Sequence, residues 1–453
     1  MGRPQFSKFH RYRPAAFALL LAGGVAGPAL GQTDPGVRGG SPGAGGPLAG
    51  LGTLEVKLFN AAQIHFETID SVSGTISGED GSGLGTAFNL NSCAGCHAQP
   101  AVGGTSPAVN PELRVATLDG ATNTIPSFVR SSGPALVPRF IDLPGGGVDG
   151  SVHDLFVITG RTDASGCTAT QPNFAQAIAN NNIVFRIPTP LFGVGQIENT
   201  PDINLIADSA ANASNDATFG IVEGDFNISP DTGNITTFGW KAQGGALEIF
   251  GGLEFSIQQG VSSELFPKKR SGGVGCGSGG QPEDTLNLVN PGTTGFAPSD
   301  FSTFTENFGD FMRLTAGPTP APATAATTAG EAVFLEVGCA LCHIPSHVTG
   351  ASSYTNQSFV TYSPFSDFAL HDMGAALADH IVQGGANGNH FRTAPLWGIG
   401  QRIFFLHDGR TTDLVTAIAD HSSSGSEANT VIANLSALTV TQQQDLLDFL
   451  RSL

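Results

Sequence analysis

Two Cys-x-x-Cys-His segments, at residues 93–97 and 339–343, carry the residue types whose spacing could do redox chemistry in this sequence. In c-type haem attachment, two thiols with this spacing bond to the porphyrin, and the adjacent histidine binds the iron as its proximal ligand. A zinc cluster or a redox disulfide can contain the same pattern. Because the pattern occurs twice and uses four of the six cysteines, we expect two covalently bound haem c groups. The attachment residues are Cys93, Cys96, His97, Cys339, Cys342 and His343.

The ligand on the far side of each iron decides whether a haem carries electrons or binds a small molecule. For the second haem the expected ligand is His421, because Leu414, Ala417, Ile418 and His421 share one face of an expected helix. A haem must fill the interior toward which that face points. Met373 is the alternative, and a thioether ligand would give a higher reduction potential than an imidazole.

The first haem lacks an obvious second protein ligand, because residues 98–104 contain neither histidine nor methionine. We therefore expect the first iron to be open or water-bound on its far side. His65 and His153 are the alternatives that could close it. An open iron can bind a small oxidant, whereas an iron with two protein ligands transfers electrons.

Two expected helices position the second motif. One follows a capping-box pattern at residues 328–331 and brings Phe334, Val337, Gly338 and Leu341 on one face into the motif. The other follows a capping-box pattern at residues 441–444 and closes the chain. Its apolar positions are Leu446, Leu447, Leu450 and Leu453. An opening helix before the haem motif and a closing helix at the end resemble a cytochrome c fold.

The part of the chain around the first motif is less regular, with Asn, Ser, Thr and Gly between short apolar runs. Residues 227–240, with Pro-Asp-Thr-Gly in the middle, predict a hairpin. We therefore expect a mainly α protein with two cytochrome c-like haem domains, the first with irregular or β insertions. The expected division is a signal peptide at 1–31, a flexible leader at 32–52, an N-terminal haem domain at 53–315, a Pro/Ala linker at 316–324 and a C-terminal haem domain at 325–453.

The first 31 residues indicate export. Four cations precede or begin an apolar stretch from Ala15 to about Leu30, and small residues before Gln32 predict cleavage there. The stretch is shorter than the roughly 20 residues that a membrane span needs. We therefore expect a periplasmic or secreted protein with no membrane span.

Charge and the remaining cysteines limit the partners. Removal of the signal leaves 16 of the 20 basic residues against 38 acidic ones, a net charge of −22. Such a chain repels nucleic acid, so we expect no nucleic-acid partner and favour a small redox protein as the electron donor. In an oxidising compartment Cys167 and Cys276, which lie outside the haem motifs, are expected to form a disulfide.

Segments in both parts of the chain resemble one family. They are residues 89–97 and 238–243 in the first part, and residues 370–374, 392–398 and 405–410 in the second. Together they resemble the di-haem oxidoreductases also labelled thiol oxidoreductases, from about residue 55 to the end. That family is similar to bacterial di-haem cytochrome c peroxidases and to the di-haem enzyme that matures the methylamine dehydrogenase cofactor.

The resemblance implies that the N-terminal haem meets peroxide, while the C-terminal haem stores or relays electrons. In the relatives a His-Asp-Gly segment precedes the sixth ligand by fourteen residues, and the segment that begins at His407 leads in this way to His421. The relatives have Met or Tyr there, so the histidine leaves the potential and the natural donor open. Residues 190–198 resemble the peroxidase segment that presents a catalytic glutamate, which implies this role for Glu198.

The resemblance is weaker for calcium. The site that relatives hold between their haems is not clearly matched, because Arg402 and Phe404 stand where Thr and Pro are expected. Calcium binding through backbone oxygens therefore remains the one alternative for such a site.

These features predict a peroxidase-like oxidoreductase that reduces hydrogen peroxide, or another small oxidant, at the first haem. Glu198 would transfer the proton, which typically contributes about 10²- to 10⁴-fold to a rate. Trp240 or Trp397 would relay electrons between the haems. The alternatives are an electron-transfer cytochrome without catalysis, a haem oxygenase-type enzyme that oxidises an organic substrate, and a colourless redox or zinc-binding module.

Overall fold

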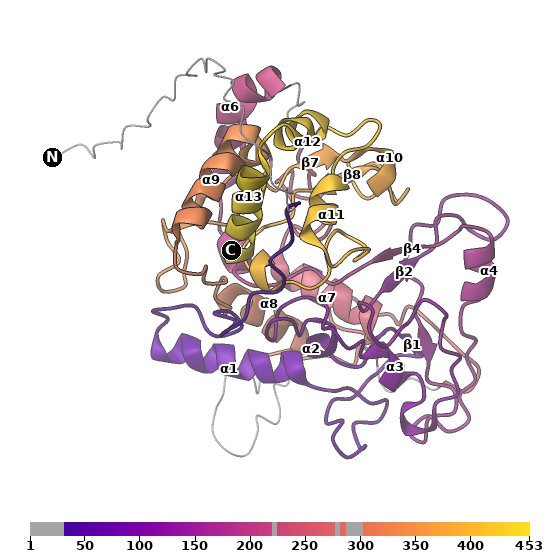
Figure 1. Cartoon of the computed structure of the whole chain (residues 1–453). Helices are drawn as coiled ribbons and strands as arrows, with labels where there is room; N and C mark the ends of the chain where they lie inside the picture. The colour runs from indigo at the N-terminus through magenta and orange to yellow at the C-terminus, as the bar shows by residue number, and fades with distance from the viewer. Residues whose placement is uncertain (1–30, 220–223, 277–280, 287–301) are drawn as a thin grey trace, which may run out of the picture. The chain divides into compact units, whose positions relative to one another are not determined.

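A computed structural model describes residues 31–219, 224–276, 281–286 and 302–453 (Figure 1). Residues 32–453 form one compact unit. The expected signal peptide lies outside the described residues except for Gly31. None of the helices in the described ranges has the length and apolar character that a membrane crossing requires.

Helices dominate the described secondary structure, and short strands lie between them, as the sequence predicts. The helices are α1 (Thr53–Glu67), α2 (Cys93–Cys96), α3 (Glu112–Val115), α4 (Phe174–Ala179), α5 (Val194–Glu198), α6 (Asp202–Phe219), α7 (Leu247–Gln258), α8 (Phe304–Leu314), α9 (Ala325–Val337), α10 (Gly374–Leu377), α11 (Leu414–Ala419), α12 (Asn429–Ser436) and α13 (Val440–Ser452). The 3₁₀ turns are Leu118–Gly120, Cys339–Leu341 and Ile399–Gln401.

The strands form two-stranded antiparallel pairs. They are β1 (Ala87–Phe88) with β3 (Phe156–Val157), β2 (Val137–Arg139) with β4 (Val184–Arg186), β5 (His347–Val348) with β6 (Thr361–Tyr362), and β7 (Leu370–Asp372) with β8 (His390–Arg392). Residues 227–240 turn back on themselves as predicted, with a bridge between Ile228 and Ile235, but a longer ladder does not form. Short pairs of this kind are too small to build a sheet, so helices and loops carry the fold.

The helices α9 and α13 pack against each other around the second motif (Figure 1). Both begin earlier than expected. The capping box of α9 uses Thr324 and Thr327, and that of α13 uses Thr439 and Gln442. At each start, two threonine-led patterns lie within a few residues of each other, and the one nearer the preceding loop forms the cap.

The end of α9 also differs from the expected continuous run into the motif. Gly338 ends the helix in a left-handed conformation with a φ of 100°, and the first three motif residues form a separate 3₁₀ turn. Glycine tolerates this φ, which other residues rarely adopt. The chain thus changes direction immediately before Cys339, and this break lets the cysteines and His343 leave the helix axis.

The helices α1, α7 and α8 pack together next to the first motif. Their contact is rich in phenylalanine, and the rings of Phe66 and Phe311 stack at 4.5 Å between centroids. The same apolar cluster includes Tyr362 and Trp397 from the second half of the chain. The two halves therefore share buried apolar surface, the main source of favourable free energy in folding.

Residues 32–52 differ from the expectation of a free leader. The Asp34 carboxylate forms an ion pair of 2.6 Å with Arg451 of α13, and the amide of Ala316 donates a hydrogen bond of 2.9 Å to the carbonyl oxygen of Gly46. The leader thus lies along both the closing helix and the Pro/Ala linker. A segment rich in glycine and proline forms no regular helix or sheet, so its backbone N–H and C=O groups need partners elsewhere. Here the backbone of the leader and the backbone of the linker supply partners for each other.

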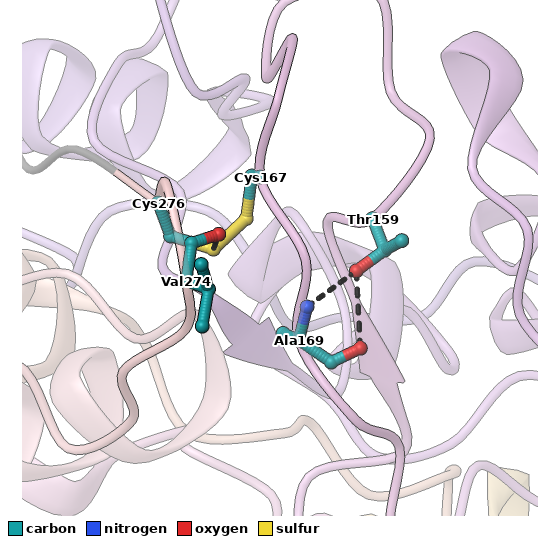
Figure 2. The surroundings of a disulfide bond; sticks show 5 residues. All are labelled: Thr159, Cys167, Ala169, Val274 and Cys276. Atoms are coloured by element: carbon teal, nitrogen blue, oxygen red, sulfur yellow. Dashed lines mark hydrogen bonds between the residues drawn. A yellow bond between two sulfur atoms is a disulfide. The ribbon is translucent and has the colours of Figure 1, made fainter.

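Cys167 and Cys276 are joined by a disulfide across 109 residues of sequence (Figure 2). Beside it, Thr168 and Val274 exchange backbone hydrogen bonds of 2.8 and 2.9 Å. The Thr159 hydroxyl and the backbone of Ala169 are also bonded, as the dashed lines in Figure 2 show. The disulfide connects the segment after α7 to the irregular part of the expected N-terminal haem domain.

Candidate haem sites

The first motif lines a cavity with about 1050 Å³ of space outside protein atoms, including the part open to solvent. Cys93 and Cys96 form the two ends of α2, and His97 follows directly, so one turn of helix brings all three to the same wall. Apolar side chains such as Phe66, Leu90 and Phe255 make up much of the same wall, so it suits a large apolar group such as a porphyrin.

The His97 ring is held by the backbone around it. Its Nδ1 lies 2.9 Å from the carbonyl oxygen of Gly104 and must donate to it, and the backbone of Thr189 also lies close to the ring. Burial lowers the pKa of His97 to about 4, so the imidazole is neutral at physiological pH. A neutral ring with a fixed tautomer is the form that binds iron.

The polar part of the first cavity wall contains Arg139, Arg186, Gln243 and Glu254. Burial and the neighbouring Arg186 lower the pKa of Arg139 to about 10, while Glu254 lies close enough to oppose this shift. Within the described ranges, the Nε atom of Arg139 has no hydrogen-bond partner. Glu254 projects from α7 and accepts a hydrogen bond of 2.8 Å from Gln258. It is the only carboxylate among the described residues of this wall.

The second motif lines a larger cavity, with about 1350 Å³ outside protein atoms. Cys339, Cys342 and His343 all lie on its wall. The Nδ1 of His343 donates to the carbonyl oxygen of Phe365 at 3.0 Å, and burial lowers the His343 pKa to about 4. The histidines of the two motifs therefore share one feature, a backbone carbonyl oxygen that accepts from Nδ1.

His421 lies on the wall of this same second cavity, together with Leu414, Ala417 and Ile418 of α11. Asp413 caps α11 by accepting from the amide of Thr416, and the helix ends two residues before His421. The Nδ1–H group of His421 donates a hydrogen bond to the carbonyl oxygen of Ala417 at 2.8 Å, and burial lowers the pKa of His421. Met373, the alternative ligand, also lines the cavity.

His371 lies on the second cavity wall as well, buried between two carboxylates. Its ring nitrogens lie 2.9 Å from Asp367 and 2.6 Å from Glu427. Burial opposes the charge, but the Cys342 sulfur and Asp367 raise the His371 pKa well above its usual value. This histidine is already bonded through both nitrogens, which leaves neither one free for iron.

A smaller cavity, the middle cavity, has about 550 Å³ outside protein atoms and shares wall residues with both haem-motif cavities. Trp240 lines all three, whereas Trp397 lines only the middle one. Trp240 is held from both halves of the chain, since its indole nitrogen donates to Ile187 at 2.8 Å and its carbonyl oxygen accepts from Arg392 at 2.9 Å. The next residue, Lys241, pairs with Asp379 at 3.0 Å.

Glu198 has a different environment from the one expected of an acid–base residue. Its carboxylate forms an ion pair of 2.6 Å with Arg313 and accepts from the amide of Leu247 at 2.8 Å, at the start of α7. Among the described residues that line the three cavities, Glu198 does not occur. It therefore anchors α7, the helix that presents Glu254.

Neither alternative ligand of the first iron belongs to the described cavity wall. His153 pairs with Asp149 at 2.8 Å and stacks on Phe140, and His65 packs edge-on against Phe304. The wall does contain Met312 of α8, a buried residue that sequence reasoning missed. Met312 lies more than 200 residues from the first motif in sequence, so no local pattern connects the two. The packing of α8 on α7 brings Met312 to the cavity wall.

The described residues contain no group of three or more His, Cys, Asp or Glu side chains placed to hold a metal ion. Arg402, which occupies a position expected to be Thr in the calcium site of relatives, is buried between the second and middle cavities. Calcium binding through backbone oxygens stays a prediction.

Residues 141–453 match the family model described as "Di-haem oxidoreductase, putative peroxidase". No curated protein matches the sequence.

Two solved structures show limited likeness. One is hydrazine synthase of Kuenenia stuttgartiensis under xenon pressure, with 18% identity and a TM-score of 0.22 over 36% of this chain and 59% of that one. The other is a MauG-like protein associated with microbial copper homeostasis, with 18% identity and a TM-score of 0.23 over 36% of this chain and 58% of that one. The matched region thus spans less than two thirds of either structure.

Proposed function

The chain belongs to the di-haem oxidoreductase family, and from this premise we propose that it reduces hydrogen peroxide at a haem held by His97, with electrons relayed from a haem held by His343. Haem supplies an iron that binds the oxidant and exchanges electrons. Peroxide reduction consumes two electrons and two protons and yields two waters. The proposal includes covalent attachment of each haem through its two motif cysteines.

The observation that supports this proposal most strongly is the difference between the two cavity walls. The second has a partly buried His421 in addition to His343, so a haem there has a second imidazole available. In the first, His97 is the only histidine among the described lining residues, and a carboxylate and two arginines share the wall. An iron with a vacant side next to such groups suits chemistry on a small oxidant.

We assign proton transfer to Glu254 rather than to Glu198. Glu254 lies on the cavity wall near Arg139 and Arg186. A carboxylate there can accept a proton from peroxide and return it to the leaving oxygen, while a guanidinium stabilises the negative charge that develops. Glu198 holds α7 in place through the Leu247 amide and Arg313, and so positions Glu254.

Trp240 is the better relay candidate of the two tryptophans, because it lines both haem-motif cavities. The hydrogen bond from its indole nitrogen to Ile187 holds the ring in one orientation, and its backbone carbonyl accepts from Arg392 in the second half of the chain. Trp397 packs in the shared apolar cluster and lines only the middle cavity.

The donor is proposed to be a small redox protein in the periplasm or outside the cell. The strongly acidic mature chain favours a partner with a basic contact surface, because opposite charges accelerate encounter. Raising the salt concentration should then slow electron delivery.

A di-haem electron carrier is the second candidate, and one observation favours it. Met312 is buried on the first cavity wall, and a thioether could close the first iron. Its neighbours on that wall, Phe66 and Phe308, are apolar, and Met312 belongs to the same buried cluster as these rings. Packing within that cluster accounts for its position without ligation.

Electron paramagnetic resonance of the purified protein, oxidised and half-reduced, separates these functions. The peroxidase proposal predicts a high-spin ferric signal from one haem in at least one of these states. The Met312→Leu variant should keep that signal unchanged. Two low-spin haems in both states, with a high-spin signal only in Met312→Leu, would reject the peroxidase and establish the carrier.

A further inference from the structure

Two arginines, Arg392 and Arg402, lie on the wall that the second haem-motif cavity shares with the middle cavity. Arg392 ends β8, and Arg402 follows the 3₁₀ turn Ile399–Gln401. Only 8% and 6% of their surfaces are exposed. Charged side chains are almost never buried this deeply unless they are paired.

The two guanidinium groups lack carboxylate partners in the protein. Arg392 donates to the carbonyl oxygens of Gly239 at 2.9 Å and Thr393 at 3.4 Å, both of which are neutral. Across the described part of the chain, the Arg402 guanidinium makes no hydrogen bond or ion pair. Asp367, the acid whose field reaches Arg392, is already bonded to His371 at 2.9 Å.

Both groups nevertheless remain cations at neutral pH. Burial lowers the pKa of each to about 10, and the mutual repulsion of the pair contributes for Arg392. Placing an uncompensated charge in a protein interior is penalised by several kcal/mol. An anion in the cavity would stabilise two such charges on one wall.

We propose that Arg392 and Arg402 form a carboxylate-binding pair that holds a propionate of the second haem. The inference rests on the proposed function, in that a haem occupies this cavity. A haem carries two propionates and would be the source of negative charge in a cavity whose other charged wall residues, His371 and Glu427, are already paired. Arginine suits this role, since its planar fork matches a carboxylate with two hydrogen bonds.

The pair also has an electrostatic consequence. A fixed positive charge next to a haem opposes the ferric state, which carries one more positive charge than the ferrous state. Arg392 and Arg402 therefore raise the reduction potential of the second haem above the value that bis-histidine ligation alone would give. This places an electron store beside Trp240, on the side that faces the middle cavity.

The test uses the haem-loaded protein and three variants: Arg402→Gln, Arg402→Lys and, as a control, Arg410→Gln. Arg410 is a partly exposed arginine of the same module that pairs with Asp408 and does not line the cavity. The first readout is the propionate bending bands in the resonance Raman spectrum. The second is the midpoint potential of the second haem from a spectroelectrochemical titration.

Arg402→Gln should shift a propionate band and lower the potential of the second haem, while that of the first haem changes less. Arg402→Lys should shift the band, because the fork is lost, but keep the potential near that of the unchanged protein. Arg410→Gln should alter neither. Propionate bands that stay unchanged in every Arg402 variant that loads haem would overturn the proposal. If Arg402→Gln does not load haem, the spectrum of Arg402→Lys alone decides.

Neither readout depends on peroxide turnover, so an inactive protein with shifted bands would reject the proposed function and keep the propionate pair. A protein with no haem bands at all would reject both before any variant is compared.

Discussion

The two haem-motif cavities begin from the same five-residue pattern and differ in everything that surrounds it. Each has a partly buried histidine whose Nδ1 is bonded to a carbonyl oxygen. The first wall then adds Glu254 and two arginines, whereas the second adds His421 and a paired His371. In the proposed function, the motif attaches each haem, and residues from distant helices determine whether its iron reacts with the oxidant or transfers electrons.

Exchange of Glu254 for Gln should produce the largest effect on this difference. The variant cannot accept a proton, so peroxide turnover should fall by about 10²- to 10⁴-fold. Both haem spectra should stay as they are, since Glu254 does not bind either motif. Steady-state peroxide reduction with a reduced small electron donor measures the loss. Full turnover in Glu254→Gln would contradict the assignment.

Replacing His421 by Gly should remove the difference between the cavities from the other side. The second iron would lose its imidazole, and a high-spin signal should appear from a haem that was low-spin. Electron paramagnetic resonance of the oxidised protein measures this change, with Met373→Leu as the matched control. If Met373→Leu produces the high-spin signal and His421→Gly does not, the methionine is the ligand.

The Trp240→Phe variant tests the connection between the cavities. Loss of the indole should slow electron transfer from the second haem to the first by about tenfold, equivalent to roughly 1.4 kcal/mol in the barrier. Stopped-flow mixing of half-reduced protein with peroxide follows this step. Trp397→Phe removes an indole that lines only the middle cavity, and should have a smaller effect. Equal slowing in both variants would contradict a specific role for Trp240.

Glu198→Gln should give the smallest effect, and mainly on stability. The change removes a partly buried ion pair with Arg313 and a negative charge at the start of α7. Such contacts contribute about 1 kcal/mol in total. Thermal unfolding should therefore begin a few degrees lower, whereas turnover should fall far less than in Glu254→Gln. A turnover loss as large as that of Glu254→Gln would return the acid–base role to Glu198.

Local patterns were sufficient for part of this molecule. The helical character, the closing helix and the shared apolar face of Leu414, Ala417 and Ile418 follow from spacing over a few turns, although α11 ends at Ala419 and leaves His421 in the turn that follows. The exact helix starts at Thr324 and Thr439 did not follow, because neighbouring threonines compete for the same capping role.

Residues placed by long-range packing could not be found this way. Glu254, Met312 and Arg402 reach their cavities through contacts between segments far apart in sequence. Glu198 was singled out because its own segment resembles a known one, yet its carboxylate lies beside the Leu247 amide, 49 residues away. No periodicity within residues 190–198 contains that information.

The leader described above also affects how the protein can be handled. The amide of Thr33 donates to the Gln444 side chain of α13, and Asp34 pairs with Arg451 near the last residue of the chain. The start of the expected mature protein and the closing helix therefore share one surface. An affinity tag or immobilisation anchor at either end would crowd that surface. Surface-exposed loops of the expected N-terminal haem domain therefore offer better attachment points for electrodes or labels.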